Sequence, residues 1–485
     1  MAENKPTATI WIRDEINVSL LDLKSKHYTK LYNDFAIKDK NCFFKPNYKL
    51  GRWDGFYRFV SQTGQTYVYF IDQIVPRLIK WGYDVKVKDS RTAEFVEMQP
   101  IKEDIFGHVT NEYGDPYLLR WYQCEAVNAV VENGGGIMIA GTGAGKTIMS
   151  ASITHIYGQK GLRCITIVPS TTLVQQSSDD FKRWGLDAGQ YCGDVKELGA
   201  THLVTTWQSL QNVPHILKDF DVLIVDECHG AKANVLANLL KEHGSHIAYR
   251  FGMTGTMPKD EYERIRVLLS LGSICYEITA AMLIEEGFLS TIDINILQLM
   301  EDIDDGYFPD YSSETAYLRG NKERIQWIAN LAEKISSGEN GNTLILVGSI
   351  PFGKKLAAAI GAHFVYGADK TATRKEAYDL FKTEDNCVVV TTVQVAGTGL
   401  SIDRIFNLFL IDLGKSFIRT IQAVGRGLRK NEKAGKTHCE IYDICSNLKY
   451  SKQHLRKRVK FYKESSYPYK KTQVKNYAES VDSED

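Results

Sequence analysis

The sequence lacks any excess of charge of one sign, because its 485 residues hold 59 lysines and arginines and 59 aspartates and glutamates. Net charge therefore indicates no partner, and a nucleic-acid surface would have to come from local clusters of basic residues. No stretch approaches the roughly 20 apolar residues that a membrane-spanning helix needs. The start, MAENKPTATIWIRDE, has no basic segment followed by an apolar one, so we expect neither a secretory signal nor a membrane partner.

Closely spaced cysteine pairs are also absent. The nine cysteines are scattered from Cys42 to Cys445, and no two of them form a Cys-x-x-Cys pair. This spacing argues against a zinc ribbon or an iron–sulfur cluster, and it fits reduced thiols in a cytoplasmic protein. We find no short-period repeat and no low-complexity segment. The length then allows roughly three domains of about 150 residues each.

Residues 1–95 form a basic and aromatic zone, which we expect to be a small α+β N-terminal domain. It contains short alternating runs such as Tyr67-Val68-Tyr69-Phe70, the pattern of a half-buried strand. A helix should follow, because five apolar residues share one helical face and Gly82 can end it. These five are Ile71, Ile74, Val75, Leu78 and Ile79. Residues 96–118, with the turn YGDPY, are expected to be a linker.

Short apolar runs alternate with helical stretches in two successive segments, residues 119–292 and 293–450. The runs are GIMIA, CITIV, HLVTT and DVLIVDE in the first segment, and TLILVG, HFVYG, CVVVTT, FNLFLID and EIYDI in the second. Runs that are apolar on both faces are typical of buried parallel strands, and their alternation with helices predicts βαβ units. The acidic stretch EDIDDGYFPDYSSE is expected to be a loop, and residues 451–485 a basic tail.

The stretch AGTGAGKT, residues 140–147, fits a phosphate-binding loop that has Ala140 in place of the first glycine. A strand precedes it and a helix follows, and glycines let backbone N–H groups surround the phosphates. Lys146 would neutralise the β and γ phosphates, and Thr147 would ligate Mg²⁺. The residues expected to hold ATP are Gly141, Thr142, Gly143, Ala144, Gly145, Lys146 and Thr147. The alternative is a glycine-rich turn with a chance lysine.

A second metal ligand is expected at the end of another buried strand, in DVLIVDECH. Asp226 follows four apolar residues, so its carboxylate should emerge at the carboxyl edge of the sheet, where open α/β sheets bind ligands. Asp226 would hold Mg²⁺ directly or through water, and Glu227 would act as the base or orient the attacking water. The alternative is a solvated strand end.

A basic helix is predicted in the second α/β segment, at QAVGRGLRK. Gln422, Arg426 and Arg429 are separated by four and three residues, so they share one helical face. Such a face can reach across a cleft to nucleotide on the first domain, and an arginine there can accelerate hydrolysis by about 10³-fold or more. The alternative is a basic surface helix.

These motifs, in this order, resemble those of superfamily 2 helicases over nearly all of residues 119–430. The resemblance implies two tandem RecA-like domains, with ATP and Mg²⁺ as cofactors. LRWYQ, residues 119–123, implies Gln123 as the reader of the adenine ring. DECH resembles DEAH, with Cys228 in place of alanine, and GMTGT (252–256) resembles the motif that couples hydrolysis to movement, with Gly255 in place of alanine.

Four further segments resemble the parts of these helicases that grip one nucleic-acid strand or contact the nucleotide. They are IVPSTTLVQQ (167–176), TTWQSL (205–210), LILVGSI (344–350) and TTVQVAGTGLSID (391–403). The residues implied as backbone contacts are Pro169, Ser170, Thr206, Gln208, Ser349 and Thr392, and those implied as nucleotide contacts are Gly399 and Asp403.

The N-terminal zone narrows the resemblance. CFFKPNYKLGRWDGFYRFV, residues 42–60, is similar to the N-terminal domain of the phage UvsW-type helicases, and GNKERIQWIANLAEKI (320–335) is similar to the helix that opens their second domain. This family implies a DNA motor of recombination and repair that unwinds branched DNA, migrates junctions and removes RNA from R-loops. We expect it to act as a monomer on DNA, in the host cytoplasm if it is phage-encoded.

Two clusters of basic residues are predicted to contact DNA phosphates. The first is Lys45, Lys49, Arg52 and Arg58, and the second is Arg456, Lys457 and Arg458 in the tail. Aromatic residues interleave the first cluster and can stack on bases, but we favour them as the core of a small domain. For the tail, the alternative is a solvated helix face.

Three other functions compete with this interpretation. A restriction-type ATP-dependent nuclease subunit would need a metal-carboxylate site, and Pro309-Asp310 has no fitting Glu-x-Lys strand nearby. A non-catalytic nucleotide-gated DNA clamp would not need Glu227 and the two arginines. An RNA helicase stays open, because motifs that hold sugar and phosphate discriminate poorly between DNA and RNA.

Overall fold

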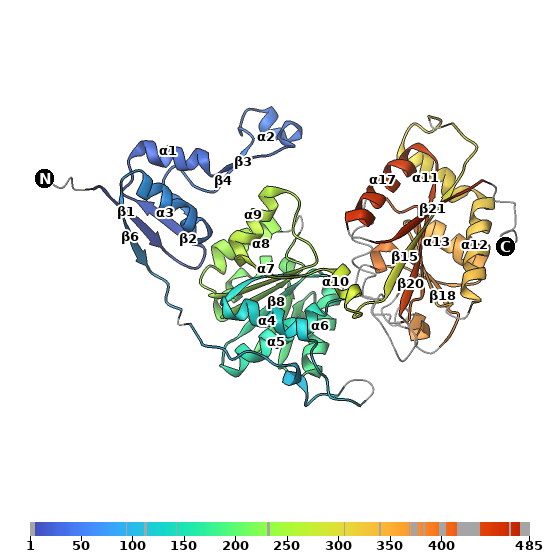
Figure 1. Cartoon of the computed structure of the whole chain (residues 1–485), viewed down its shortest axis with the longest axis horizontal. Helices are drawn as coiled ribbons and strands as arrows, with labels where there is room; N and C mark the ends of the chain where they lie inside the picture. The colour runs from blue at the N-terminus through green and yellow to red at the C-terminus, as the bar shows by residue number, and fades with distance from the viewer. Residues whose placement is uncertain are drawn as a thin grey trace. The chain divides into compact units, whose positions relative to one another are not determined.

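A computed structural model describes most of the chain, and the described part divides into two compact units. The described residues are 5–93, 95–110, 114–141, 143–229, 233–304, 306–338, 341–367, 369, 376–377, 379–381, 384–396, 404–414, 437–464 and 467–475. The first unit comprises residues 1–140 and 145–278, and the second comprises residues 141–144 and 279–485 (Figure 1). Among the described helices, none has the length and apolar character needed to cross a membrane.

The N-terminal part of the first unit is a small α+β domain. Its sheet has the order β5-β2-β1-β6, with strands β1 (Thr7–Ile12), β2 (Asn17–Leu21), β5 (Gln65–Tyr67) and β6 (Asp84–Asp89). Helices α1 (Ser25–Asp34) and α3 (Ile71–Lys80) supply apolar side chains to its core. The predicted helix from Ile71 is confirmed. Of the alternating run at 67–70, only Tyr67 lies in a strand, because residues Val68–Phe70 form a 3₁₀ turn that buries Phe70 in this core.

A segment that we call the finger, residues 36–58, extends from this small domain. Strands β3 (Ala36–Lys38) and β4 (Phe56–Arg58) pair antiparallel, and the chain between them forms η1 (Cys42–Phe44) and α2 (Pro46–Lys49). Figure 1 shows α2 at the far end of this segment. Two paired strands alone are marginally stable in water, so the finger depends on packing at its base.

The small domain packs on the first α/β domain. Leu269 of helix α9 (Glu261–Leu271) is part of the N-terminal core, and Tyr262 and Ile265 of the same helix pack against it. The Arg250 guanidinium donates a 2.7 Å hydrogen bond to the carbonyl of Glu15. The N-terminal domain is therefore one body with the first α/β domain.

The first α/β domain contains an eight-stranded sheet of order β10-β9-β11-β8-β12-β13-β7-β14. All neighbours are parallel except β9 and β10. The strands are β7 (Gly135–Ala140), β8 (Cys164–Val168), β9 (Ala188–Cys192), β10 (Val195–Lys196), β11 (His202–Thr206), β12 (Val222–Asp226), β13 (Tyr249–Thr254) and β14 (Ile274–Ile278). The four strands predicted here from apolar runs are confirmed. The remaining helices of this domain are α4 (Trp121–Glu132), α5 (Lys146–Gln159), α6 (Thr171–Arg183), α7 (Trp207–Asn212) and α8 (Ala233–His243).

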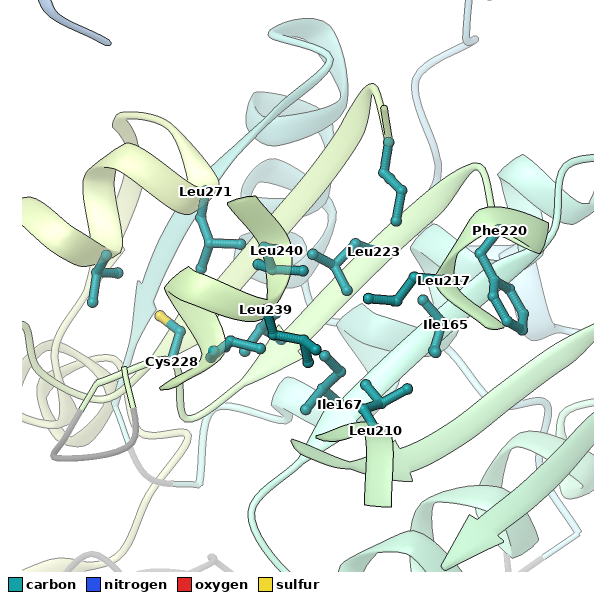
Figure 2. Close-up of a cluster of buried hydrophobic side chains, with 14 of the residues drawn as sticks. Ile165, Ile167, Leu210, Leu217, Phe220, Leu223, Cys228, Leu239, Leu240 and Leu271 are labelled. Atoms are coloured by element: carbon teal, nitrogen blue, oxygen red, sulfur yellow. The ribbon is translucent and has the colours of Figure 1, made fainter. Parts of the chain in front are cut away.

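Helix α8 covers one face of this sheet and fixes the end of β12. Leu239 and Leu240 of α8 face the apolar side chains of β8 and β12, and Leu271 of α9 lies beside them (Figure 2). Cys228, two residues beyond β12, points its sulfur into the same cluster and is only 4% exposed. The chain after β12 is thus held by a buried thiol at a point next to Glu227.

The second unit holds a seven-stranded parallel sheet of order β17-β18-β16-β19-β20-β15-β21. Its strands are β15 (Thr291–Leu299), β16 (Thr343–Val347), β17 (His363–Val365), β18 (Val388–Thr392), β19 (Asn407–Ile411), β20 (His438–Ser446) and β21 (Tyr469–Val474). The described helices include α10 (Ala280–Glu285), α11 (Tyr311–Gly320), α12 (Lys322–Ser336), α13 (Ile350–Ile360), α15 (Val393–Ala396) and α17 (Lys449–Glu464). All five strands predicted here from apolar runs are confirmed.

The expectation of a separate basic tail is wrong. Residues from Lys449 form α17, and β21 then joins the sheet as an edge strand parallel to β15. Tyr462 of α17 is fully buried in the core of this unit. The acidic stretch is also not entirely a loop, because Asp310 caps α11, which begins at Tyr311. Pairing with β15 orders β21, and Glu314 of α11 accepts hydrogen bonds from the backbone N–H groups of Tyr450 and Ser451 at the start of α17.

Candidate functional site

The register of three neighbouring strands brings the predicted nucleotide-binding residues to one sheet edge. Strand β13 lies between β12 and β7, with Asp226 opposite Met253 and Thr254 opposite Ile139. The phosphate loop follows β7 directly, and Glu227 follows β12. Because all three strands are parallel, their carboxyl ends meet on the same side, where open α/β sheets bind ligands.

The backbone of the predicted phosphate loop requires its glycines. Gly143 and Gly145 both have φ of 87°, a left-handed conformation that residues with a side chain rarely adopt. Helix α5 starts at Lys146 immediately after Gly145, and no side chain caps it. A long helix that begins at a glycine loop offers N–H groups and a positive dipole end to an anion. These features fit the binding of a triphosphate.

Lys146 lies between the loop and the acidic strand end. Its Nζ is 3.1 Å from Oε1 of Glu227 and donates a longer, 3.4 Å hydrogen bond to the carbonyl of Ala140. Glu227 has φ of 50°, a left-handed conformation that is uncommon for residues other than glycine. Burial alone would raise the pKa of Glu227, but the charge of Lys146 and a hydrogen bond with His229 lower it to about 2. Glu227 is therefore ionised at neutral pH, as a residue that orients an attacking water must be.

Glu227 is linked to the GMTGT segment through His229. Nδ1 of His229 lies 3.2 Å from Oε2 of Glu227 and 2.6 Å from Oγ1 of Thr254. Oγ1 of Thr254 also lies within hydrogen-bond distance of the carbonyl of Thr256, at 2.8 Å. The chain Glu227–His229–Thr254 physically connects the nucleotide site to the segment predicted to couple hydrolysis to movement.

His229 was not among the predicted site residues, although it is the last letter of DECH. The sequence shows its place in the motif but not its partner, because Thr254 is 25 residues away. Cys228, by contrast, packs in the core, and burial raises the pKa of its thiol. The cysteine that replaces alanine in this motif thus serves packing.

The residues predicted to hold Mg²⁺ have the chemistry that this ion prefers. Thr147 offers a hydroxyl at the first turn of α5, and Asp226 offers a carboxylate at the end of β12. Both are half-buried at the same sheet edge, and Mg²⁺ takes oxygen ligands, usually one or two from protein plus phosphate and water. The oxygen atoms of both side chains would suit a Mg²⁺ ion that binds together with a triphosphate.

Gln123, predicted to read adenine, lies beside the phosphate loop at the start of α4. It is 6% exposed, and its Oε1 accepts a 2.9 Å hydrogen bond from the backbone N–H of Arg120. A methyl group added at Gly145 would come within 2.4 Å of its Nε2. Gln123 is thus placed against the nucleotide loop.

The residues predicted to contact the backbone of one nucleic-acid strand lie at strand-to-helix turns. The hydroxyl of Ser170 caps α6 and that of Thr206 caps α7, while Gln208 is exposed and Pro169 and Ser349 are half-buried. Thr206 is 2% and Thr392 7% exposed, so contacts of these two side chains with a phosphate are not supported. Six predicted residues lie outside the described part of the chain: Thr142, Gly399, Asp403, Gln422, Arg426 and Arg429.

The prediction that Arg458 contacts DNA is wrong. Arg458 is 2% exposed, its Nε lies 2.8 Å from Asp443, and its Nη1 donates a 2.6 Å hydrogen bond to the carbonyl of Leu413. The face of α17 that carries Arg458 packs on the sheet, whereas Arg456 and Lys457 are exposed. Those two stay predictions as phosphate contacts.

In the finger, two of the four predicted basic contacts already have carboxylate partners. Lys45 pairs with Asp39 at 2.6 Å, and Arg58 pairs with Asp54. Lys49 and Arg52 are exposed. We therefore regard Lys49 and Arg52 as the better candidates for phosphate contacts in this segment.

Comparison with known proteins agrees with this arrangement. Residues 117–259 match the family of the type III restriction enzyme res subunit, and residues 324–431 match the helicase conserved C-terminal domain. The chain is 24% identical over 455 residues to the ATP-dependent DNA helicase UvsW of Enterobacteria phage T4, which covers 87% of this chain and 88% of the phage protein.

More distant relatives share the same core. The DNA 3'-5' helicase XPB of Kineococcus radiotolerans is 23% identical and covers 76% of this chain and 68% of its own. A fragment of a putative HsdR subunit of a type I restriction enzyme from Vibrio vulnificus has the same fold, with a TM-score of 0.55, 17% identity and coverage of 77% of this chain and 71% of that fragment. With the phosphate loop, the acidic strand end and both matched domains, the chain is a superfamily 2 helicase related to phage UvsW, an enzyme with ATP-dependent nucleic-acid helicase activity.

Proposed function

We propose that this helicase uses ATP hydrolysis to unwind or branch-migrate branched DNA, such as junctions, forks and R-loops, in recombination and repair. The main support for the use of ATP hydrolysis is the ion pair between Lys146 and Glu227 at the phosphate loop. This pair is linked through His229 to Thr254. The choice of branched DNA is supported by the similarity to a phage DNA helicase along 87% of the chain.

The ion pair gives the site a switch between two arrangements. Lys146 and Glu227 form an ion pair, with 3.1 Å between Nζ and Oε1. A triphosphate in the loop offers Lys146 a partner of higher negative charge, so Lys146 turns to the phosphate and Glu227 is freed to orient the attacking water. Because Glu227 also contacts His229, its release changes the hydrogen bonds of Thr254. Nucleotide binding is thereby transmitted to the GMTGT segment.

Mg²⁺ would be held by Thr147 and Asp226, and when bound it neutralises charge on the phosphates. Arg426 and Arg429, within the matched C-terminal helicase domain, are proposed to stabilise the charge that develops during hydrolysis. The segments around Ser170, Gln208 and Ser349 are proposed to hold one strand through its backbone. Phosphate contacts carry no sequence information, so recognition should depend on the shape of the DNA.

The test compares unwinding of a Holliday junction, a replication fork, an R-loop and a linear duplex under one condition, with the wild type and Glu227→Gln. We expect faster unwinding of the branched substrates by the wild type, and none by Glu227→Gln although it binds ATP. Equal rates on the linear duplex would refute the preference for branched DNA. ATP turnover by Glu227→Gln at the wild-type rate would refute the role of Glu227.

A restriction-type nuclease is the second candidate, because restriction-enzyme motors share the fold. The carboxylate of Asp310, the candidate nuclease ligand, caps helix α11 by accepting from the N–H of Ser313 at 2.8 Å. Among the described residues, one cluster of three histidine or carboxylate side chains lies close enough to share a metal ion, namely Asp293, His438 and Glu440, and Asp310 is not part of it. An assay for ATP- and Mg²⁺-dependent cleavage of DNA separates the two functions. Unwinding of an RNA duplex at the DNA rate would favour an RNA helicase.

A further inference from the structure

The finger carries large apolar side chains that are mostly exposed at its surface. Phe43 is 56%, Phe44 80% and Leu50 63% exposed, whereas Trp53 and Tyr57 are half-buried. The prediction that the aromatic residues of this segment form a core is therefore wrong for Phe44. Exposed rings on a small domain cost solvation free energy and commonly mark an interaction site.

The charge around these rings indicates a polyanionic partner. The finger holds six cations and two carboxylates, and both carboxylates are used inside it, Asp39 by Lys45 and Asp54 by Arg58. Lys40, Lys49 and Arg52 are exposed and have no carboxylate partner among the described residues. Nζ of Lys38 lies 5.8 Å from the ring centre of Phe43. The exposed rings thus lie within a positively charged segment, which suits nucleic acid because bases match the rings and phosphates match the cations.

The tip is held in place by packing within the finger. The ring of Phe43 contacts that of Tyr48 edge to face, with centroids 5.2 Å apart. A side chain at Gly55 would come within 3.2 Å of Cys42 and 3.1 Å of Tyr48, so the tip packs closely on the base of the finger. The indole N–H of Trp53 donates to the carbonyl of Phe56 at 2.8 Å. A rigid tip loses little entropy when it binds.

The base of the finger is braced on the first α/β domain. The ring of Tyr57 stacks on that of Tyr262 in α9, with centroids 3.7 Å apart and planes 14° from parallel. Tyr262 and Phe59 also pack together, and α9 shares the N-terminal core. The finger is therefore fixed to the domain that carries the phosphate loop.

The geometry points to the finger as the element that recognises the branch point itself: Phe43 and Phe44 stack on base faces where strands part, and Lys40, Lys49 and Arg52 hold the flanking phosphates. In a continuous duplex, neighbouring base pairs cover these faces, so the rings find a partner only at a fork, a junction or a strand end. Phosphate contacts bind any DNA, whereas the rings select branched DNA. This inference rests on the proposed function.

The experiment uses the full chain and a forked DNA with 2-aminopurine at the first base pair of the branch. Binding of the wild type should raise the 2-aminopurine fluorescence, because stacking on Phe43 and Phe44 opens that pair. The double variant Phe43→Ala/Phe44→Ala should lose this rise and unwind the fork about tenfold more slowly, within the cost of removing base-stacking rings. Its ATPase rate on single-stranded DNA should stay within about twofold of the wild type, since the phosphate loop is untouched.

Two matched variants complete the design. Tyr307→Ala removes a ring that is 71% exposed in the second unit and should change nothing. Phe43→Trp/Phe44→Trp keeps stacking surfaces and should restore the fluorescence signal, which a merely structural role would not do. If the wild type unwinds forks and the double alanine variant does so at the same rate, the inference fails. If the wild type does not prefer branched DNA, the proposed function fails first.

Discussion

In each of the two parallel-sheet domains, an acidic residue in the left-handed backbone conformation comes directly after a buried strand. Glu227 follows β12 with φ of 50°, and Asp412 follows β19 with φ of 46°. The side chain of Glu227 is 29% exposed and pairs with Lys146, which is 11% exposed. Asp412 is 8% exposed and pairs with Arg324, which is fully buried. The same local geometry thus supports an open ion pair in one domain and a closed one in the other.

The difference lies in what surrounds each pair. Lys146 starts a helix after a glycine loop, where an incoming phosphate can replace the carboxylate. Arg324 sits inside α12, holds both oxygens of Asp412 at 2.7 and 2.8 Å, and lies 3.7 Å from Glu301. A buried, bidentate pair is costly to break, so it fixes the chain after β19 and cannot exchange partners. The first pair is placed to exchange partners, whereas the second fixes the chain after β19.

The largest effect is expected from Lys146→Ala. Removing the charge that faces the phosphates should lower DNA-stimulated ATP hydrolysis by about 10²- to 10³-fold, as loss of one transition-state donor does. DNA binding should be retained. Steady-state phosphate release measures the rate, and Lys160→Ala, at the other end of α5, is the matched control. Hydrolysis within threefold of the wild type would contradict the role of the open pair.

Arg324→Ala should act on stability and not on chemistry. Asp412 would be left buried without its partner, which typically costs about 3–5 kcal/mol. Urea unfolding followed by fluorescence measures the loss, and Lys322→Ala, exposed on the same helix, should cost far less. A loss under about 1 kcal/mol would show that the closed pair is no more important than a surface pair.

The open pair should also give stability a specific pH dependence. Burial raises the pKa of Glu227, but Lys146 and His229 lower it on balance from the ordinary 4.5 to about 2. Because the folded pKa is depressed, the stabilisation is fully present above pH 4.5 and is lost as the pH falls toward 2. The difference in urea midpoint between the wild type and Glu227→Gln should therefore be constant from pH 7 to 5 and close below 4.5. A gap that widens on acidification would reverse the assigned sign.

The smallest effect is expected from substitutions on helix α17. Arg458 lies on the face of this helix that packs on the sheet, whereas Arg456 and Lys457 lie on an exposed face. Burial alone would lower the pKa of Arg458, but the Asp443 carboxylate raises it, so Arg458 stays charged inside the fold. Arg456→Glu/Lys457→Glu should weaken DNA binding severalfold and make the plot of log affinity against log salt shallower, by about 0.9 for each phosphate that is no longer neutralised. Binding titrations at three salt concentrations measure the slope. An unchanged slope would remove this helix from the DNA surface.

The strands of both sheets were largely predictable, because fully buried parallel strands leave continuous apolar runs such as CITIV and TLILV. Strand β9, Ala188–Cys192, was not predicted, since AGQYC is no apolar run and is buried only by its neighbours. Strand β21 was also missed, because its sequence contains no apolar run. Five of its six residues are exposed, and it is a strand only because it pairs with β15.

The residues of the candidate site also divide into those that the local sequence predicts and those that it does not. The glycine loop, Lys146 and the Asp226-Glu227 pair follow from local sequence, because phosphate and Mg²⁺ chemistry restricts which residues can serve. The partner of His229, the burial of Arg458 and the exposure of Phe44 do not follow from sequence. Each depends on residues that are distant along the chain and adjacent only in the fold.

The sequence by itself determined that two βαβ domains form and that one of them holds a triphosphate, because hydrophobic periodicity and glycine-dependent backbone geometry are local properties. Only the tertiary structure decided which charges are free to act. Lys146 and Arg324 are both cations beside carboxylates, but burial makes one pair exchangeable and the other permanent. Desolvation depends on everything packed around a side chain, and no stretch of sequence contains that information.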